Sequence, residues 1–280
     1  MTSTYKISFN TLQHGGLKEI FTSLQRASIE LGINFYLIGA LARDVWFAEK
    51  GIRAIGTKDI DVAVMITDEH AFDVLKNFLV SKENFTTSSS NDYVLFDKEG
   101  HQIDILPFGK IEIEGKKIID KKGIVHTDVT GFKEVFELST EEVNFENEFK
   151  FRVSTLAGVV ILKLIAYDDR PEIRSNDIGD IANIIKHYFD LETELIFEEH
   201  ADLLIADHKP EFIGARVLGR QIKKILDKNE LLKDRVLTIL RSNTANPEQS
   251  KIGKVFVQGN IENVEEAIGV LTEIIKGIEE

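Results

Sequence analysis

The chain is 280 residues long and 43% apolar, which is enough to bury the core of one large domain or two medium ones. It contains no cysteine, which excludes disulfides, thiolate metal sites and cysteine nucleophiles. The net charge of −13 is spread over both halves and argues against a general nucleic-acid binder, because phosphate binding needs a basic surface. The first residues lack the apolar segment of a signal peptide, and no apolar run approaches membrane-spanning length. We therefore expect a cytoplasmic protein with no membrane partner.

The first 150 residues show the apolar periodicities and turn signals of helices mixed with strands. The first predicted elements are a helix over 16–31 that ends at Gly32, a strand over 33–38 and a short helix after Gly39. They are followed by a strand over 58–66 and a helix capped by Thr67 or Asp68. A hairpin of 92–97 and 101–106 and a strand pair within 110–119, which turns at Glu114–Gly115, complete this part.

From residue 154 onward the pattern is helical. The predicted helices cover 155–168, 177–189, 211–227, 230–241 and 262–278, and Pro210 suits the start of the third. The pattern of residues 243–258, where valines flank Phe256, fits either a short strand or a linker. We therefore predict an α+β protein. An α/β domain of residues 1–150, with a mixed sheet flanked by helices, is followed by a helical C-terminal domain of residues 151–280.

Three aspartates interrupt strands that are otherwise apolar: Asp59 and Asp61 in the strand over 58–66, and Asp104 in the strand over 101–106. Alternate residues of a strand face the same side, so Asp59 and Asp61 project together, with carboxylates roughly 6–7 Å apart. A neighbouring strand can bring Asp104 against them. Charges are rare in such strands without a partner. The natural partner of three close carboxylates is a hard divalent cation, most often magnesium.

The alternative is that these are three unrelated aspartates on the polar face of a sheet, since an Asp-x-Asp pair alone is common. Three close carboxylates without a cation would repel one another, and some of their pKa values would rise. The third aspartate and the glycine turn upstream of the pair favour the metal site.

The upstream turn consists of Gly39 and Ala40, where a buried strand is followed by a helix. Gly39 has no Cβ, so the backbone can approach a ligand, and the helix start offers unpaired N–H groups to an anion. A tight strand–helix turn explains the dipeptide alone more simply, but its place ahead of the aspartates favours a nucleotide site. Arg43, one turn further on, can reach a triphosphate or form a surface ion pair with Asp44 or Glu49.

A single charge, Lys163, interrupts the apolar helix predicted over 155–168, which should therefore be buried. A lysine there is costly unless it meets a carboxylate or a phosphate. It is either directed at the metal cleft or extends to solvent at the domain interface. Asp177 and Asp180 share a face of the next helix. Asp180 can orient Lys163 or bind an acceptor, whereas helix capping is a competing role for Asp177.

Five lysines crowd one short stretch: Lys110, Lys116, Lys117, Lys121 and Lys122. They either protect an exposed edge strand from pairing with another chain or bind RNA or a nucleotide. The chain has no P-loop, no Gly-x-Ser-x-Gly and no His-x-x-x-His. These absences argue against a P-loop nucleotide site, a serine hydrolase and a histidine metal site.

The order of these motifs resembles the DNA polymerase β-type nucleotidyltransferase superfamily, whose signature is Gly-Ser or Gly-Gly, then Asp-x-Asp, then a third aspartate. The resemblance covers about residues 30–190 and is carried by Ile38–Asp44, Thr57–Asp61, Ile103–Ile105, and Leu162–Ala166 followed by Asp177-x-x-Asp180. Within the superfamily the chain is most similar to AbiEii/AbiGii toxin-type nucleotidyltransferases. Ala40 departs from the pattern, because it lacks a serine hydroxyl.

The resemblance implies a nucleotidyltransferase-type fold and magnesium-dependent transfer of a nucleoside monophosphate from a nucleoside triphosphate to an acceptor hydroxyl, with release of pyrophosphate. On this basis Asp59 and Asp61 would hold two magnesium ions. Asp104 would complete the metal site and help to activate the acceptor.

For the remaining site residues the resemblance implies that Gly39, Ala40 and Arg43 bind the nucleotide. Lys163 and Asp180 match further motif positions and would serve phosphate binding or acceptor activation. Three functions follow as hypotheses: a toxin-type enzyme that acts on RNA such as a tRNA 3′ end, with an antitoxin as partner; an enzyme that modifies a small molecule, as antibiotic-modifying members do; and a non-catalytic nucleotide-binding module.

Overall fold

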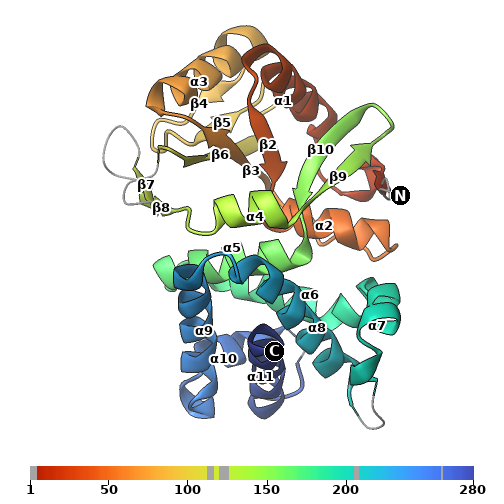
Figure 1. Ribbon diagram of the computed structural model, residues 1–280. Helices are drawn as coiled ribbons and strands as arrows, with labels where there is room; N and C mark the ends of the chain where they lie inside the picture. Colours follow the sequence, from red (N-terminus) through yellow and green to blue (C-terminus); the bar gives the residue numbers. More distant parts are fainter. Residues whose placement is uncertain (1–4, 112–116, 120–125, 205–207, 260) are drawn as a thin grey trace. The chain divides into compact units, whose positions relative to one another are not determined.

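A computed structural model of the chain describes residues 5–111, 117–119, 126–204, 208–259 and 261–280 (Figure 1). The chain divides into two compact units, Met1–Thr155 and Leu156–Glu280. The boundary expected at residue 150 falls within a strand of the first unit, β10 (Phe149–Ser154).

The first unit combines a mixed sheet with helices. Its strands are β1 (Tyr5–Ile7), β2 (Asn34–Leu37), β3 (Asp59–Ile66), β4 (Thr86–Thr87), β5 (Val94–Phe96), β6 (Gln102–Gly109), β7 (Lys117–Ile119), β8 (His126–Asp128), β9 (Thr140–Phe145) and β10. Its helices are α1 (Leu17–Leu31), α2 (Gly39–Glu49), α3 (Glu69–Glu83) and α4 (Phe132–Leu138). In the described residues the main sheet has eight strands in the order β1-β9-β10-β2-β3-β6-β5-β4, while β7 and β8 pair separately.

One face of this sheet is apolar and covered by α1 and α3. The side chains of Ile60 and Val62 on β3 and of Ile103 on β6 are fully buried. Phe21 of α1 packs on Phe151 of β10, with ring centroids 4.6 Å apart. Phe72 of α3 contacts Tyr93, next to β5. These contacts place both helices on the same face (Figure 1).

The opposite face carries the polar residues and is here called the aspartate face. On β3 and β6 it is formed by Asp59, Asp61, Ala63, Gln102, Asp104 and Leu106, which alternate along the strands with the residues of the apolar face. Helix α4 covers the end of this face away from the aspartates: its Phe136 contacts Tyr36 of β2 and Phe108 of β6. The hydroxyl of Tyr36 donates a hydrogen bond of 2.9 Å to the carbonyl of Phe132. The aspartate end of the face therefore lies beside α4, not beneath it.

The second unit is helical, with α5 (Leu156–Asp169), α6 (Ser175–Leu191), α7 (Thr193–Glu199), α8 (Pro210–Leu226), α9 (Glu230–Thr244), α10 (Lys251–Gln258) and α11 (Val264–Glu279). Helix α5 is buried nearly all round, as its apolar sequence predicts, and packs against α6, α8 and α9. Among the described residues, no helix is both long and apolar enough to cross a membrane.

The predicted fold class is confirmed: a mixed sheet flanked by helices is followed by a helical part. The predicted helix end at Gly32 and the cap at Asp68 are also confirmed, since Gly32 is left-handed and Asp68 accepts a hydrogen bond from the Ala71 N–H. Pro210 begins α8 as predicted.

Some of the elements differ from the expectations or were not expected. A strand beginning at residue 110 was expected to pair with one ending at residue 119, and this prediction is wrong. Lys110 and Ile111 form a turn after Gly109, and β7 pairs with β8. The turn expected at Glu114–Gly115 lies outside the described residues, as do Lys116, Lys121 and Lys122. The region 243–258, expected to be a short strand or a linker, contains the helix α10, which is capped by Ser250. Strands β9 and β10 had not been predicted.

The cap of α10 can be tested by Ser250→Ala. The buried Ser250 hydroxyl accepts a hydrogen bond of 2.9 Å from the Gly253 N–H. Its loss should lower the free energy of unfolding by about 1–2 kcal/mol, as measured by urea denaturation. Ser175→Ala, at an exposed position without a capping hydrogen bond, is the control and should change little. Equal values for the two variants would contradict the assigned cap.

Candidate active site

The parallel pairing of β3 and β6 brings two of the three aspartates side by side. Asp61 is the register partner of Asp104, and Asp59 is the register partner of Gln102. Because register partners on adjacent strands face the same side, all three aspartates lie on the aspartate face, and each is half-buried. The backbone arrangement predicted for the triad is therefore present.

The side chains are not gathered around a common point. Asp104 accepts a hydrogen bond of 2.8 Å from the Gln102 amide, which turns one of its oxygens along its own strand. In the part of the chain that the structure describes, no group of three or more histidine, cysteine, aspartate or glutamate side chains is placed to hold a metal ion. The donor set, carboxylate oxygens alone, fits magnesium, and the backbone fits a shared site. The side chains would have to rotate to complete it.

The backbone turn at Gly39 packs closely against the Asp61 side chain. Gly39 is the first residue of α2 and has a φ of 66°. A Cβ at this position would stand 2.2 Å from Asp61 Oδ2, so only glycine fits between the turn and the carboxylate. The Ile38 N–H also donates to the Asp61 carbonyl, at 3.1 Å. Two contacts thus fix the start of α2, with half-buried Ala40 in its first turn, beside the aspartate pair.

Arg43 is paired with Asp44, and the pair is buried, not at the surface. Its side chain is 1% exposed, and its Nε donates to Asp44 Oδ1 at 2.8 Å. The second Asp44 oxygen accepts a hydrogen bond of 2.9 Å from the Gly56 N–H, in the loop that leads into β3. Arg43 and Asp44 therefore anchor the loop before Asp59. Binding of a triphosphate by Arg43 would require this pair to open.

Lys163 is a buried cation held between two carboxylates of α6. Its side chain is 8% exposed, and its Nζ lies 2.8 Å from Asp177 and 2.7 Å from Asp180. Burial alone would lower the pKa of Lys163, but the two carboxylates outweigh burial, so its pKa is raised and the amine stays charged. Asp177 lies in the first turn of α6 and is not its cap. The lysine does not extend to solvent, and these ion pairs join α5 to α6 within the second unit.

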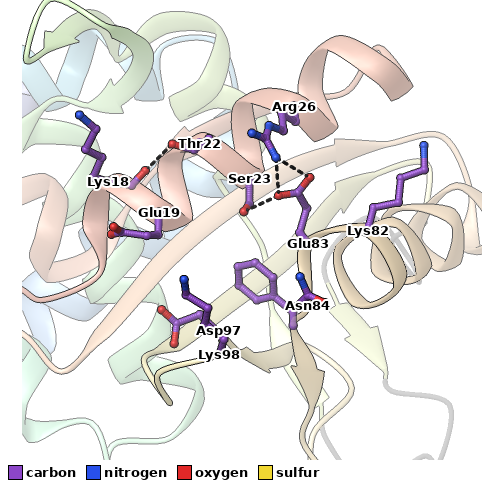
Figure 2. Close-up of a pocket in the computed structure, with 11 residues that line it drawn as sticks. Lys18, Glu19, Thr22, Ser23, Arg26, Lys82, Glu83, Asn84, Asp97 and Lys98 are labelled. Atoms are coloured by element: carbon purple, nitrogen blue, oxygen red, sulfur yellow. Dashed lines mark hydrogen bonds and ion pairs between the residues drawn. The ribbon is translucent and has the colours of Figure 1, made fainter.

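A hollow of about 370 Å³ lies elsewhere in the first unit (Figure 2). It is bordered by α1, the end of α3 and the turn between β5 and β6, and Glu83 accepts hydrogen bonds there from Ser23 and Arg26. Its lining residues include none of the predicted site residues.

Two polar residues of the aspartate face were missed from sequence, Gln102 and Arg152. The spacing from Gln102 to Asp104 is that of two residues on one strand face, and this signal was available. Arg152 lies on β10, which had not been predicted as a strand, although the alternation of apolar and charged residues over 149–153 was an available signal.

Comparisons with known proteins find a distant structural likeness. No family model and no curated protein matches the chain. Among solved structures, the antibiotic-resistance factor ANT(2'')-Ia is 11% identical, with a TM-score of 0.36 over 81% of this chain and 93% of that one. A CCA-adding enzyme in complex with CTP is 16% identical, with a TM-score of 0.31 over 81% of this chain and 53% of that one. These likenesses assign no role to any residue of this chain.

The contact between Gly39 and Asp61 can be tested by Gly39→Ala with Gly32→Ala as the matched control. Both glycines have a φ of 66°, but a Cβ at Gly32 meets nothing within 4 Å. Each variant should lose about 1–2 kcal/mol of unfolding free energy from backbone strain. Gly39→Ala should lose more, because the Cβ displaces Asp61. Equal losses in urea denaturation would contradict the close approach.

The ion pairs of Lys163 can be tested by Lys163→Met, which leaves two carboxylates without their cation. The free energy of unfolding should fall by about 3 kcal/mol near neutral pH. Because the folded-state pKa is raised above 10.5, this stabilisation is complete below pH 10.5 and is lost as the pH rises further. The difference in unfolding free energy between wild type and variant should therefore shrink only above pH 10.5. Lys186→Met, at an exposed lysine of α6, should change little; a similar loss there would contradict the assignment.

Proposed function

We propose that the chain is a nucleotidyltransferase, which moves a nucleoside monophosphate from a nucleoside triphosphate to an acceptor hydroxyl. The observation that carries the proposal is the placement of Asp61 between its register partner Asp104 and the tight turn at Gly39. Carboxylates that can take a divalent cation thus lie directly beside a helix start that can take a phosphate.

The chemistry requires little covalent participation by the protein. The acceptor oxygen attacks the α-phosphorus, the bond from this phosphorus to the bridging oxygen breaks, and pyrophosphate leaves with the electron pair. Asp104 is the candidate to take the proton of the acceptor hydroxyl, with Gln102 holding one of its oxygens. Asp59 and Asp61, with Asp104, would hold magnesium, which when bound neutralises charge on the phosphates.

Gly39 and Ala40 would contribute backbone N–H groups to the triphosphate, so the missing hydroxyl at position 40 weakens binding without abolishing it. Arg43 would act indirectly, by anchoring through Asp44 the loop that leads to Asp59. The Lys163–Asp180 pair would contribute to phosphate binding or acceptor activation if the carboxylates release the amine to a phosphate. These roles follow from the resemblance, together with the positions of the residues.

For the acceptor we propose the 3′ end of an RNA such as tRNA, as in a toxin-type enzyme of the AbiEii class with an antitoxin partner. The lysines around Lys110, which is exposed, are the feature that favours RNA. The net charge of −13 favours the second candidate, a small hydroxylated molecule of the antibiotic type, because a polyanion would be repelled.

The proposal is tested by pyrophosphate release. The protein is incubated with magnesium and each nucleoside triphosphate, with total tRNA, with aminoglycosides, or with neither. We expect release with one class of acceptor, and at least a 100-fold loss, roughly, in Asp59→Asn/Asp61→Asn, because both carboxylates act on the transferred phosphate. Asp234→Asn, at an exposed aspartate of α9, is the control and should retain activity.

The same incubations with triphosphates radiolabelled at the α-phosphate identify the acceptor: label transferred to tRNA indicates the RNA acceptor, and label transferred to the aminoglycoside indicates the small-molecule acceptor. Binding of a triphosphate without release of pyrophosphate under any condition would refute the enzyme and leave a nucleotide-binding module. Full activity of the double variant would refute the assigned site.

A further inference from the structure

Arg152 is an exposed cation on the aspartate face, and it has no acidic partner among the residues that the structure describes. Arg152 of β10 is the register partner of Tyr36, which pairs with Ala63 of β3, which in turn pairs with Leu106 of β6. These four residues form one row across the sheet. Because register partners share a face, Arg152 lies on the same face as the aspartates, one row nearer to α4.

The nearest carboxylate along this row is engaged elsewhere. Glu142 of β9 is the register partner of Arg152 on its other side, but its carboxylate binds Lys150, at 2.9 Å. Arg152 is exposed and forms no ion pair or hydrogen bond through its guanidinium with any residue that the structure describes. Its N–H groups are therefore available to a ligand.

The guanidinium is nevertheless held in place. Its central carbon lies 4.7 Å from the centroid of the Phe136 ring of α4, at cation–π distance. Stacking on an aromatic ring restricts the side chain without using its N–H groups, so less entropy is lost when it binds an anion. An ordered arginine with open N–H groups is suited to bidentate contact with phosphate oxygens.

The order of elements across the sheet gives this cation a position relative to the proposed reaction. Strand β2, which ends at the Gly39 turn, lies between β3 and β10. Neighbouring strands are about 4.8 Å apart, so β10 lies about 10 Å from β3. The spatial order across the face, from β6 to β10, is thus Asp104, Asp61, the Gly39 turn and Arg152.

On the basis of the proposed nucleotidyl transfer, we infer that Arg152 binds the β- and γ-phosphates of the nucleoside triphosphate. The triphosphate then runs across the sheet from β3 towards β10, with its α-phosphate at the aspartates. Arg152 is a binding residue for the leaving pyrophosphate, and a nucleoside monophosphate, which lacks these two phosphates, does not reach it.

The test compares binding of each nucleoside triphosphate and the matching monophosphate, by calorimetry in the presence of magnesium. Arg152→Gln should weaken triphosphate binding by about 10- to 100-fold and leave monophosphate binding unchanged. Arg152→Lys, which keeps the charge but loses the planar fork, should be intermediate. The matched control is Lys6→Gln, at an exposed lysine of β1, two strands beyond β10 on the side away from β3, which should bind both nucleotides as the wild type does.

The outcomes separate this inference from the function on which it rests. If wild type and Arg152→Gln bind the triphosphate equally, the inference is wrong while the proposed function stands. An equal loss of both nucleotides in Arg152→Gln, with unchanged melting temperature, would also overturn it. If the wild type binds no triphosphate, the proposed function and the role of Arg152 fail together. If Arg152→Gln does not fold, the binding of triphosphate and monophosphate is compared between the wild type and Arg152→Lys instead.

Discussion

The candidate site depends on one interaction, the parallel pairing of β3 with β6 in the register that sets Asp61 beside Asp104. A shift of this register by one residue would turn Asp104 into the apolar face and expose Ile103 or Ile105. The burial of Ile60, Val62, Ile103 and Ile105 prevents such a shift, because all four side chains are fully excluded from solvent. The core beneath α1 and α3 thus determines which residues lie together on the aspartate face.

The turn at Gly39 couples this face to a helix start. Because the position admits no Cβ, the first turn of α2 approaches the Asp61 carboxylate more closely than any other residue would allow. The buried Arg43–Asp44 pair holds the loop before β3 from the other side. In this arrangement the sheet and the turn fix the backbone positions of the aspartates, and under the proposed function their side chains would rotate to bind a cation.

Much of this was predictable because strand periodicity is explicit around the aspartates: apolar residues flank each of them, so the shared face of Asp59 and Asp61 followed from spacing alone. The position of Gly39 at the start of a helix was equally clear. Strand β10 was missed although Phe149 to Val153 alternate between apolar and charged residues, which is the signal of a half-buried strand, whereas the two glutamates of β9 leave that strand a weaker pattern. The burial of the Arg43–Asp44 pair, and the binding of Lys163 to both Asp177 and Asp180, depend on side-chain packing that sequence spacing does not encode.

The central claim is that the aspartate face takes up a divalent cation. The most direct measurement is the binding of Mn²⁺, as a paramagnetic substitute for Mg²⁺, to wild type and Asp61→Asn by electron paramagnetic resonance, with a nucleoside triphosphate present. We predict saturable protein-bound Mn²⁺ in the wild type and its loss in the variant. Equal binding by the two proteins, or none by the wild type, would contradict the account.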